Sequence, residues 1–254
     1  MIRGLGYIAD SPDPRDILLG SVVAGDDPLP SVASLAVHEH PTLDQRESQA
    51  CVGFAVAQGI YTRWGVLGSP PYLPSATFIW WLARKAQGTN LQDAPTGLRE
   101  AFKAVRLLGA ARETSWSHQA PQMVASFQPP LSAFRDAYDA RFPLAYYRLS
   151  QGTVRRRYDF MLAISKGRPV VFGTLVDRAF CNLGFHGALQ PFDAAQAIGG
   201  HALVATGYDD RGIIGANSWG VGWGNHGSFR LSWSWLATSL VVDAWAVDCQ
   251  LPGP

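Results

Sequence analysis

The apolar pattern of this chain changes its period after about residue 167, and that change constrains the fold more than any other feature. Before it, apolar side chains recur at helical spacing, and after it they alternate along short segments. Helices followed by antiparallel strands predict an α+β chain with two segregated lobes. The expected helices span residues 50–64, 75–85, 96–108, 132–138 and 159–166, and the expected strands span 169–175, 201–208, 212–217, 227–231 and 243–247.

Several boundaries carry local signals. Ser75 can cap the second helix, and Gly109 and Gly167 stand where the third and fifth helices should end. The basic run at residues 155–157 precedes the fifth helix and is expected to be solvated.

The composition is that of an ordinary globular protein, with 254 residues, 47% of them hydrophobic, and a formal charge of +1. Near-neutrality gives no electrostatic reason to expect nucleic acid or an acidic membrane as a partner. No apolar run is long enough to span a bilayer, and residues 1–16 lack the apolar centre of a secretory signal. We therefore expect a cytoplasmic protein, or an effector exported without a signal peptide.

The three cysteines, Cys51, Cys181 and Cys249, are few, odd in number and far apart. They do not describe a disulfide framework, so a reducing compartment is favoured. A single bond between Cys181 and Cys249 stays open as an alternative.

Residues 1–36 are rich in Pro, Asp and Gly, and the prolines at 12 and 14 prevent a helix there. Two interpretations are open. The segment is either a poorly ordered terminus or an arm that packs on the body or over a cleft.

Cys51 stands at the expected start of a buried helix. Unpaired amides and the helix dipole favour negative charge there, so a thiolate is expected to have a lowered pKa and to be a good nucleophile. A cysteine in such a place is also commonly just a small buried hydrophobe.

His201 and Asn217 lie on two neighbouring strands that can form a hairpin. Such a hairpin would bring the Asn217 amide beside the His201 imidazole, where its carbonyl can fix the tautomer of the ring. Trp219 would shield that hydrogen bond from water. Gln45, six residues before Cys51, could join the Cys51 amide as a donor to an oxyanion.

Together these residues resemble the papain-like cysteine peptidases. The resemblance rests on the Gln45-to-Cys51 step, on Gly200-His201-Ala202, and on Asn217-Ser218-Trp219-Gly220 with the glycines that follow. It covers roughly residues 36–245. The arm, with Tyr7, Asp10 and residues 12–16, is most similar to that of short bacterial members.

The resemblance implies a papain-like fold and a thiolate mechanism. Residues 37–140 would form a helical lobe around the Cys51 helix, and residues 141–254 a β-barrel-like lobe carrying His201 and Asn217, with the active site between them. Cys51 would attack a peptide carbonyl, Gln45 and the Cys51 amide would hold the oxyanion, and His201 would protonate the leaving amine. The partner would be a peptide or protein substrate, with no metal or other cofactor.

The substrate-binding residues are expected along the walls of that cleft. Pro95, Thr96 and Gly97 stand where the family has its non-prime wall, and Gly199 and Gly200 would line the S2 side, leaving room for a hydrophobic side chain. Equally, these are ordinary loop residues. The full candidate set is Gln49, Ala50, Pro95, Thr96, Gly97, Gly199, Gly200 and Trp219.

Two departures from the family pattern bear on regulation and specificity. Gln49 replaces the usual glycine, and we expect its bulk to narrow the S1 side. The arm at residues 1–36 is too short for the family's inhibitory prodomain, and we expect it to lie against the body and partly cover the cleft.

An endopeptidase is the leading interpretation of the function. The alternatives are a thiol acyltransferase or deamidase on the same scaffold, and a catalytically silent peptide-binding effector. An exopeptidase would need a group that holds a substrate terminus, for which the loop at residues 185–187 is the candidate.

Overall fold

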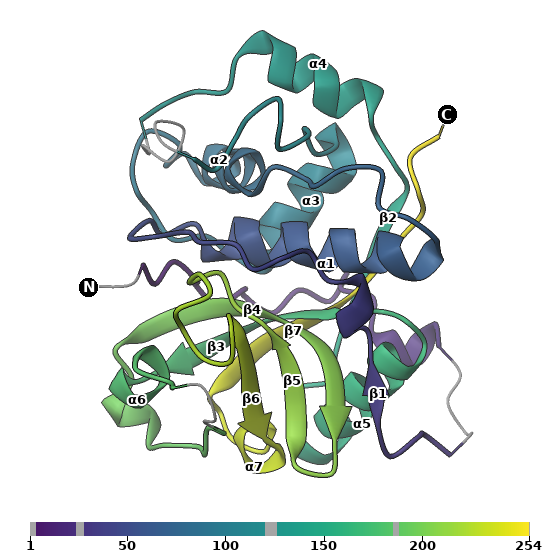
Figure 1. The fold of residues 1–254 in the computed structure, drawn as a ribbon, viewed down its shortest axis with the longest axis vertical. Coiled ribbons are helices and arrows are strands. Elements are labelled where there is room, and N and C mark those ends of the chain that lie inside the picture. The colour runs from purple at the N-terminus through teal and green to yellow at the C-terminus, as the bar shows by residue number, and fades with distance from the viewer. Residues whose placement is uncertain (1–3, 24–27, 120–125, 185–187, 254) are drawn as a thin grey trace.

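The computed structural model describes residues 4–23, 28–119, 126–184 and 188–253. The chain is arranged in two parts, with the helices of residues 51–139 above an antiparallel sheet and the later helices that accompany the sheet (Figure 1). The predicted α+β architecture is confirmed. The positions of the boundaries near residues 36 and 140 stay predictions.

The helical part consists of α1 (Cys51–Leu67), α2 (Ala76–Gln87), α3 (Leu98–Leu108) and α4 (Leu131–Asp139). Ser75 caps α2 as predicted, since its hydroxyl accepts the Phe78 N–H at 3.1 Å. The third helix begins at Leu98 and not at residue 96, because the Thr96 backbone is extended and bonds to Gly6 and Ile8 instead.

The sheet has the strand order β2-β7-β3-β4-β5-β6, and every pairing in it is antiparallel. Its strands are β2 (Leu144–Arg148), β3 (Val170–Val176), β4 (Gly199–Asp209), β5 (Gly212–Ala216), β6 (Ser228–Ser232) and β7 (Val241–Cys249), and β1 (Ala33–Ser34) pairs with β4. Strands β1 and β2 were not predicted from the sequence.

Helix α5 (Thr153–Ser165) begins earlier than the predicted residue 159 and contains the basic run. Arg156 of that run is buried and donates to the carbonyls of Gln151, Leu236 and Thr238, so the prediction of a solvated run is wrong for this residue. The short elements are α6 (Arg178–Cys181), α7 (Trp233–Leu236), and the 3-10 turns at Leu19–Ser21, Ala36–His38 and Ala194–Gln196.

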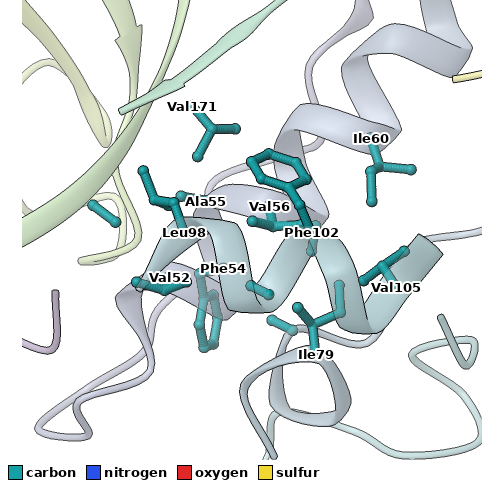
Figure 2. Close-up of a cluster of buried hydrophobic side chains, with 14 of the residues drawn as sticks. Val52, Phe54, Ala55, Val56, Ile60, Ile79, Leu98, Phe102, Val105 and Val171 are labelled. Atoms are coloured by element: carbon teal, nitrogen blue, oxygen red, sulfur yellow. The ribbon is translucent and has the colours of Figure 1, made fainter. Parts of the chain in front are cut away.

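Helix α1 joins the two parts, because it packs on α2, on α3 and on the sheet. Its residue Gly59 lies so close to the sheet that a Cβ there would meet the valines at 171, 204 and 247. Figure 2 shows apolar side chains of α1 and α3 together with Val171 of β3 in one buried cluster. Burial of α1 on nearly all sides therefore fixes the position of its first residue, Cys51.

None of the three cysteines forms a disulfide, so the alternative bond between Cys181 and Cys249 is not present. Within the described ranges, the structure contains no helix with both the length and the apolar character needed to cross a bilayer.

Candidate active site

Cys51 is the first residue of α1, as the sequence analysis expects, and its side chain is fully buried. Burial raises the pKa of its thiol to about 11, although the backbone N–H groups of Ala202, Gly6 and Val52 are directed at the sulfur and lower the pKa in part. The expected lowering of the pKa is thus wrong for this state of the protein. The helix terminus is present, but desolvation of the thiolate outweighs it.

His201 lies near the start of β4, with its ring fully buried. Its Nε2 lies 2.8 Å from Asn217 Oδ1. The same Oδ1 accepts the Ser218 N–H at 2.7 Å, which fixes the orientation of the amide. Nε2 is therefore the donor, and in the neutral ring Nδ1 carries the lone pair.

His201 Nδ1 is buried and has no hydrogen-bond partner among the described residues. The ring is held beside α1, since the N–H of Ala202, the next residue, is directed at the Cys51 sulfur. Burial lowers the pKa of His201 to about 4, and the bond to Asn217 offsets this only in part. Thiol and imidazole are accordingly both neutral at pH 7 in this structure.

An aromatic layer covers the histidine. The Trp219 ring lies with its centroid 4.3 Å from that of His201, and the Phe180 ring contacts both of them. Both rings are fully buried, so they keep water from the bond between His201 and Asn217.

Gln45 is fully buried beside the same segment. Its Oε1 accepts from Ser218 Oγ at 2.6 Å, and its backbone N–H donates to the Ser218 carbonyl at 2.8 Å. Its Nε2 donates to the carbonyls of Ser48 at 2.7 Å and of Gly4 at 3.1 Å. The Gln45 Nε2 group, which is expected to donate to an oxyanion, therefore already donates to a carbonyl oxygen of the arm.

The N-terminal arm runs through the site from Gly4 to Asp10. Gly6 directs its N–H at the Cys51 sulfur and accepts the Thr96 N–H at 2.9 Å. Tyr7 donates to the Gly200 carbonyl at 3.2 Å, and Ile8 donates to the Thr96 carbonyl at 3.1 Å. Of the two interpretations of this segment, the structure supports an arm packed on the body.

Most of the other candidate substrate-binding residues touch this arm or the wall beside it. A Cβ on Gly97 would meet the Asp10 carboxylate, and one on Gly199 would meet the Leu5 side chain. Gln49 bonds through its N–H and its Nε2 to Asp93, at 2.9 and 2.6 Å. Ala50 is buried in the core next to Cys51, and Pro95 is half-buried in the wall before α3.

Sequence reasoning missed a buried polar network at the far end of this segment. Asp243 of β7 accepts from Tyr7 and from Arg148 of β2, and Asp16 accepts from both Arg148 and Arg99 of α3. Tyr7, Asp10 and Asp16 were noted only as features of the arm. Nothing in the local sequence around Arg148 or Asp243 marks them as its partners.

Among the residues that the structure describes, no cluster of three or more His, Cys, Asp or Glu side chains could hold a metal ion. The loop at residues 185–187, the candidate for holding a substrate terminus, lies outside the described residues.

No family model matches the chain. It is 26% identical to an uncharacterized peptidase C1-like protein of Acanthamoeba polyphaga mimivirus, over 97% of this chain and 87% of that protein. The structure is similar to that of xylellain, a cysteine protease from Xylella fastidiosa, with a TM-score of 0.82 and 26% identity over 97% of this chain and 96% of the other.

The same fold occurs in digestive procathepsin L 3 of Tenebrio molitor larval midgut, with a TM-score of 0.72 and 16% identity over 96% of this chain and 75% of the other. Fold and relatives agree with the sequence motifs. The chain therefore belongs to the papain-like cysteine peptidases.

Proposed function

We propose that this hydrolase is an endopeptidase with Cys51 as nucleophile, His201 as general base and acid, and Asn217 as the residue that orients the imidazole. The observation that carries the proposal is the 2.8 Å hydrogen bond from His201 Nε2 to Asn217 Oδ1. This bond leaves the lone pair of Nδ1 available for a proton, and the next residue, Ala202, directs its N–H at the Cys51 sulfur.

The reaction follows from this geometry. Nδ1 takes the proton of the Cys51 thiol, and the sulfur attacks the scissile carbonyl carbon. The Cys51 N–H and Gln45 Nε2 stabilise the resulting oxyanion, with Ser218 and Ser48 holding the Gln45 amide in place. His201 then protonates the leaving amine, and a water molecule releases the acyl group with His201 as base.

The arm is proposed to keep the enzyme inactive while it is bound. The Gly4 carbonyl takes the Gln45 donor, and the Gly6 backbone covers the sulfur. Burial under the arm also keeps both members of the catalytic pair uncharged. Release of the arm would free the oxyanion donor and resolvate the thiolate in one step.

Labelling with an epoxysuccinyl inhibitor tests the nucleophile. We expect a single adduct on Cys51 after the arm is displaced, no adduct in Cys51→Ala, and an unchanged adduct in Cys181→Ser as the matched control. His201→Ala should abolish peptide cleavage while the protein stays folded.

Mass spectrometry of a peptide library separates the possible reactions. Internal cleavage supports the endopeptidase, amine incorporation or loss of ammonia from Gln would indicate acyl transfer or deamidation, and release of terminal residues an exopeptidase. A folded, arm-displaced protein that gives neither adduct nor product would exclude the proposal.

A further inference from the structure

A buried side-chain pocket lies beside the proposed catalytic residues and is filled by Tyr7 of the arm. Its floor is the row of Ala202, Gly173 and Asp243, which lie abreast on β4, β3 and β7. A Cβ on Gly173 would overlap the Tyr7 ring, and one on Gly200 would crowd its Cδ1 atom. Glycine at these two positions is what makes room for an aromatic ring. We call this site the Tyr7 pocket, and its residues are Ala202, Gly173, Gly200 and Asp243.

The far end of the Tyr7 pocket is a carboxylate. Asp243 is 2% exposed, and its Oδ2 accepts from the Tyr7 hydroxyl at 2.6 Å and from the Asp10 N–H at 2.7 Å. Its Oδ1 accepts from the Arg148 guanidinium. Both donors on Oδ2 belong to the arm, so the departure of the arm leaves a buried acceptor aimed into an empty pocket.

The pocket lies next to the reacting sulfur. Tyr7 follows Gly6, whose N–H is directed at Cys51, and Tyr7 bonds to the carbonyl of Gly200, the residue before His201. A peptide that reaches Cys51 in an extended conformation must therefore place a side chain at this position, as strand-like peptide recognition requires.

We propose that the Tyr7 pocket selects substrates with a tyrosine on the amino-terminal side of the scissile bond, and that Asp243 is the specificity-determining residue. This inference rests on the proposed peptidase function. A phenol donates to Asp243 Oδ2 and restores the bond that the arm had made. Phenylalanine fills the same space but leaves a buried carboxylate oxygen without a donor.

A basic side chain fits the pocket less well. Asp243 already forms an ion pair with Arg148. Asp16 forms ion pairs with both Arg148 and Arg99. Once the arm carries Asp16 away, Arg148 and Arg99 remain opposite the single carboxylate. A third buried cation would add repulsion without a counter-charge.

Fluorogenic peptides test the preference on the full chain, with Gly6→Val and Tyr7→Ala combined so that the arm leaves both the sulfur and the pocket. Tyr, 4-aminophenylalanine, Phe, O-methyltyrosine and Arg are compared first at the second residue before the scissile bond and then at the residue adjacent to it. At one of these positions kcat/KM should be about tenfold to hundredfold higher for Tyr than for Phe. 4-Aminophenylalanine, which keeps a donor, should exceed Phe, and O-methyltyrosine should not. Equal rates for Tyr and Phe, or a preference for Arg, would overturn the inference.

The arm itself provides a second test that needs no turnover. Tyr7→Phe should raise the rate of Cys51 alkylation about tenfold, and Tyr7→Arg should raise it further, because the pocket then rejects the arm. Tyr138→Phe, at an exposed position on α4, is the matched control and should leave the rate unchanged. Slow alkylation in Tyr7→Arg would show that the pocket takes cations.

The two tests separate the inference from the proposed function. If no peptide is cleaved, the peptidase proposal fails, yet the alkylation series still decides what the pocket accepts. If peptides are cleaved without regard to tyrosine, the inference fails alone.

Discussion

Two stretches of the N-terminal arm are held in opposite ways. Residues 4–6, the blocking segment, meet Cys51 and Gln45 through main-chain atoms of Gly4 and Gly6, which have no side chain to contribute. Residues 7–16, the anchoring segment, are held by side chains in a buried network. The difference indicates that obstruction of Cys51 and attachment of the arm depend on separate residues.

The blocking segment works by close fit. A Cβ on Gly4 would overlap the Ser48 carbonyl, and one on Gly6 would overlap the Gln49 carbonyl. Glycine is required here because the backbone approaches the wall more closely than any side chain permits.

The anchoring segment works by charge. Asp16 bridges Arg99 and Arg148 at 2.6 Å each, and all three side chains are less than a tenth exposed. Such a network resists removal of one member, because the partners are left buried without counter-charges.

The largest expected effect comes from breaking the fit of the blocking segment. Gly6→Val should raise the rate of Cys51 alkylation at pH 7 at least about hundredfold, because the pKa falls from about 11 toward the ordinary value and the sulfur becomes accessible. Iodoacetamide labelling followed by mass spectrometry measures the rate.

Gly222→Val is the matched control, since Gly222 is exposed and a Cβ there meets nothing within 4 Å. An unchanged rate in Gly6→Val would mean that the blocking segment does not control access.

Breaking the anchor should affect stability more than chemistry. Asp16→Ala leaves Arg99 and Arg148 short of a counter-charge, and we expect the free energy of unfolding to fall by about 3 kcal/mol. Alkylation should rise only about tenfold, because the glycine fit remains. Denaturant titration and labelling give the two values.

Asp13→Ala is the control within the same segment. Asp13 pairs with the exposed Arg15, so its loss should leave both measurements unchanged. If Asp16→Ala instead opened the site as fully as Gly6→Val, blocking and anchoring would not be separable.

A smaller effect concerns the pH profile of the thiol. In the wild-type chain the alkylation rate of Cys51 should rise about tenfold per pH unit up to about pH 11, since the raised pKa keeps the thiolate scarce below it. In Gly6→Val the plateau should be reached at least one unit lower. Cys249, whose pKa is raised to about 12 by burial in the core, is the internal control and should not respond to the variant.

Much of the fold could be predicted because local sequence patterns determine many of its helices and strands. The apolar residues of α1 and α2, the Ser75 cap and the short apolar runs of β3 and β4 can each be recognised from neighbours in sequence. β2 was missed because Leu144–Arg148 combines aromatic and apolar residues without alternation. The start of α5 was missed because three successive arginines resemble a solvated loop.

Only those contacts of the site that follow from the spacing of residues along the chain could be predicted. His201 lies on β4 and Asn217 directly follows β5, the next strand of the hairpin, so their proximity follows from the sixteen-residue separation. The state of Cys51 does not follow in this way. Its raised pKa comes from burial. Gly6 of the arm, 45 residues earlier, directs an N–H at the sulfur that lowers the pKa in part, and no local rule at a helix terminus contains that contact.

The smallest expected effect concerns the pH dependence of the binding of the arm. Burial and the nearby Asp243 raise the pKa of Asp10 to about 6, although Arg99 and Arg148 lower it in part. Burial lowers the pKa of His201 to about 4. As pH falls through this range, Asp10 takes up a proton more readily when the arm is bound, which favours binding. His201 takes up a proton less readily when the arm is bound, which disfavours binding of the arm at low pH. The two effects oppose each other in the wild-type chain.

Asp10→Asn removes the favourable effect and leaves that of His201. Binding of the arm should then weaken as pH falls from about 6.5 to about 4, whereas in the wild-type chain it should stay nearly constant. Hydrogen exchange of residues 4–10, corrected for the intrinsic pH dependence, measures this as a loss of protection in the variant alone. An equal loss in both proteins would show that Asp10 does not offset the histidine, and the anchoring segment would then be insensitive to acid.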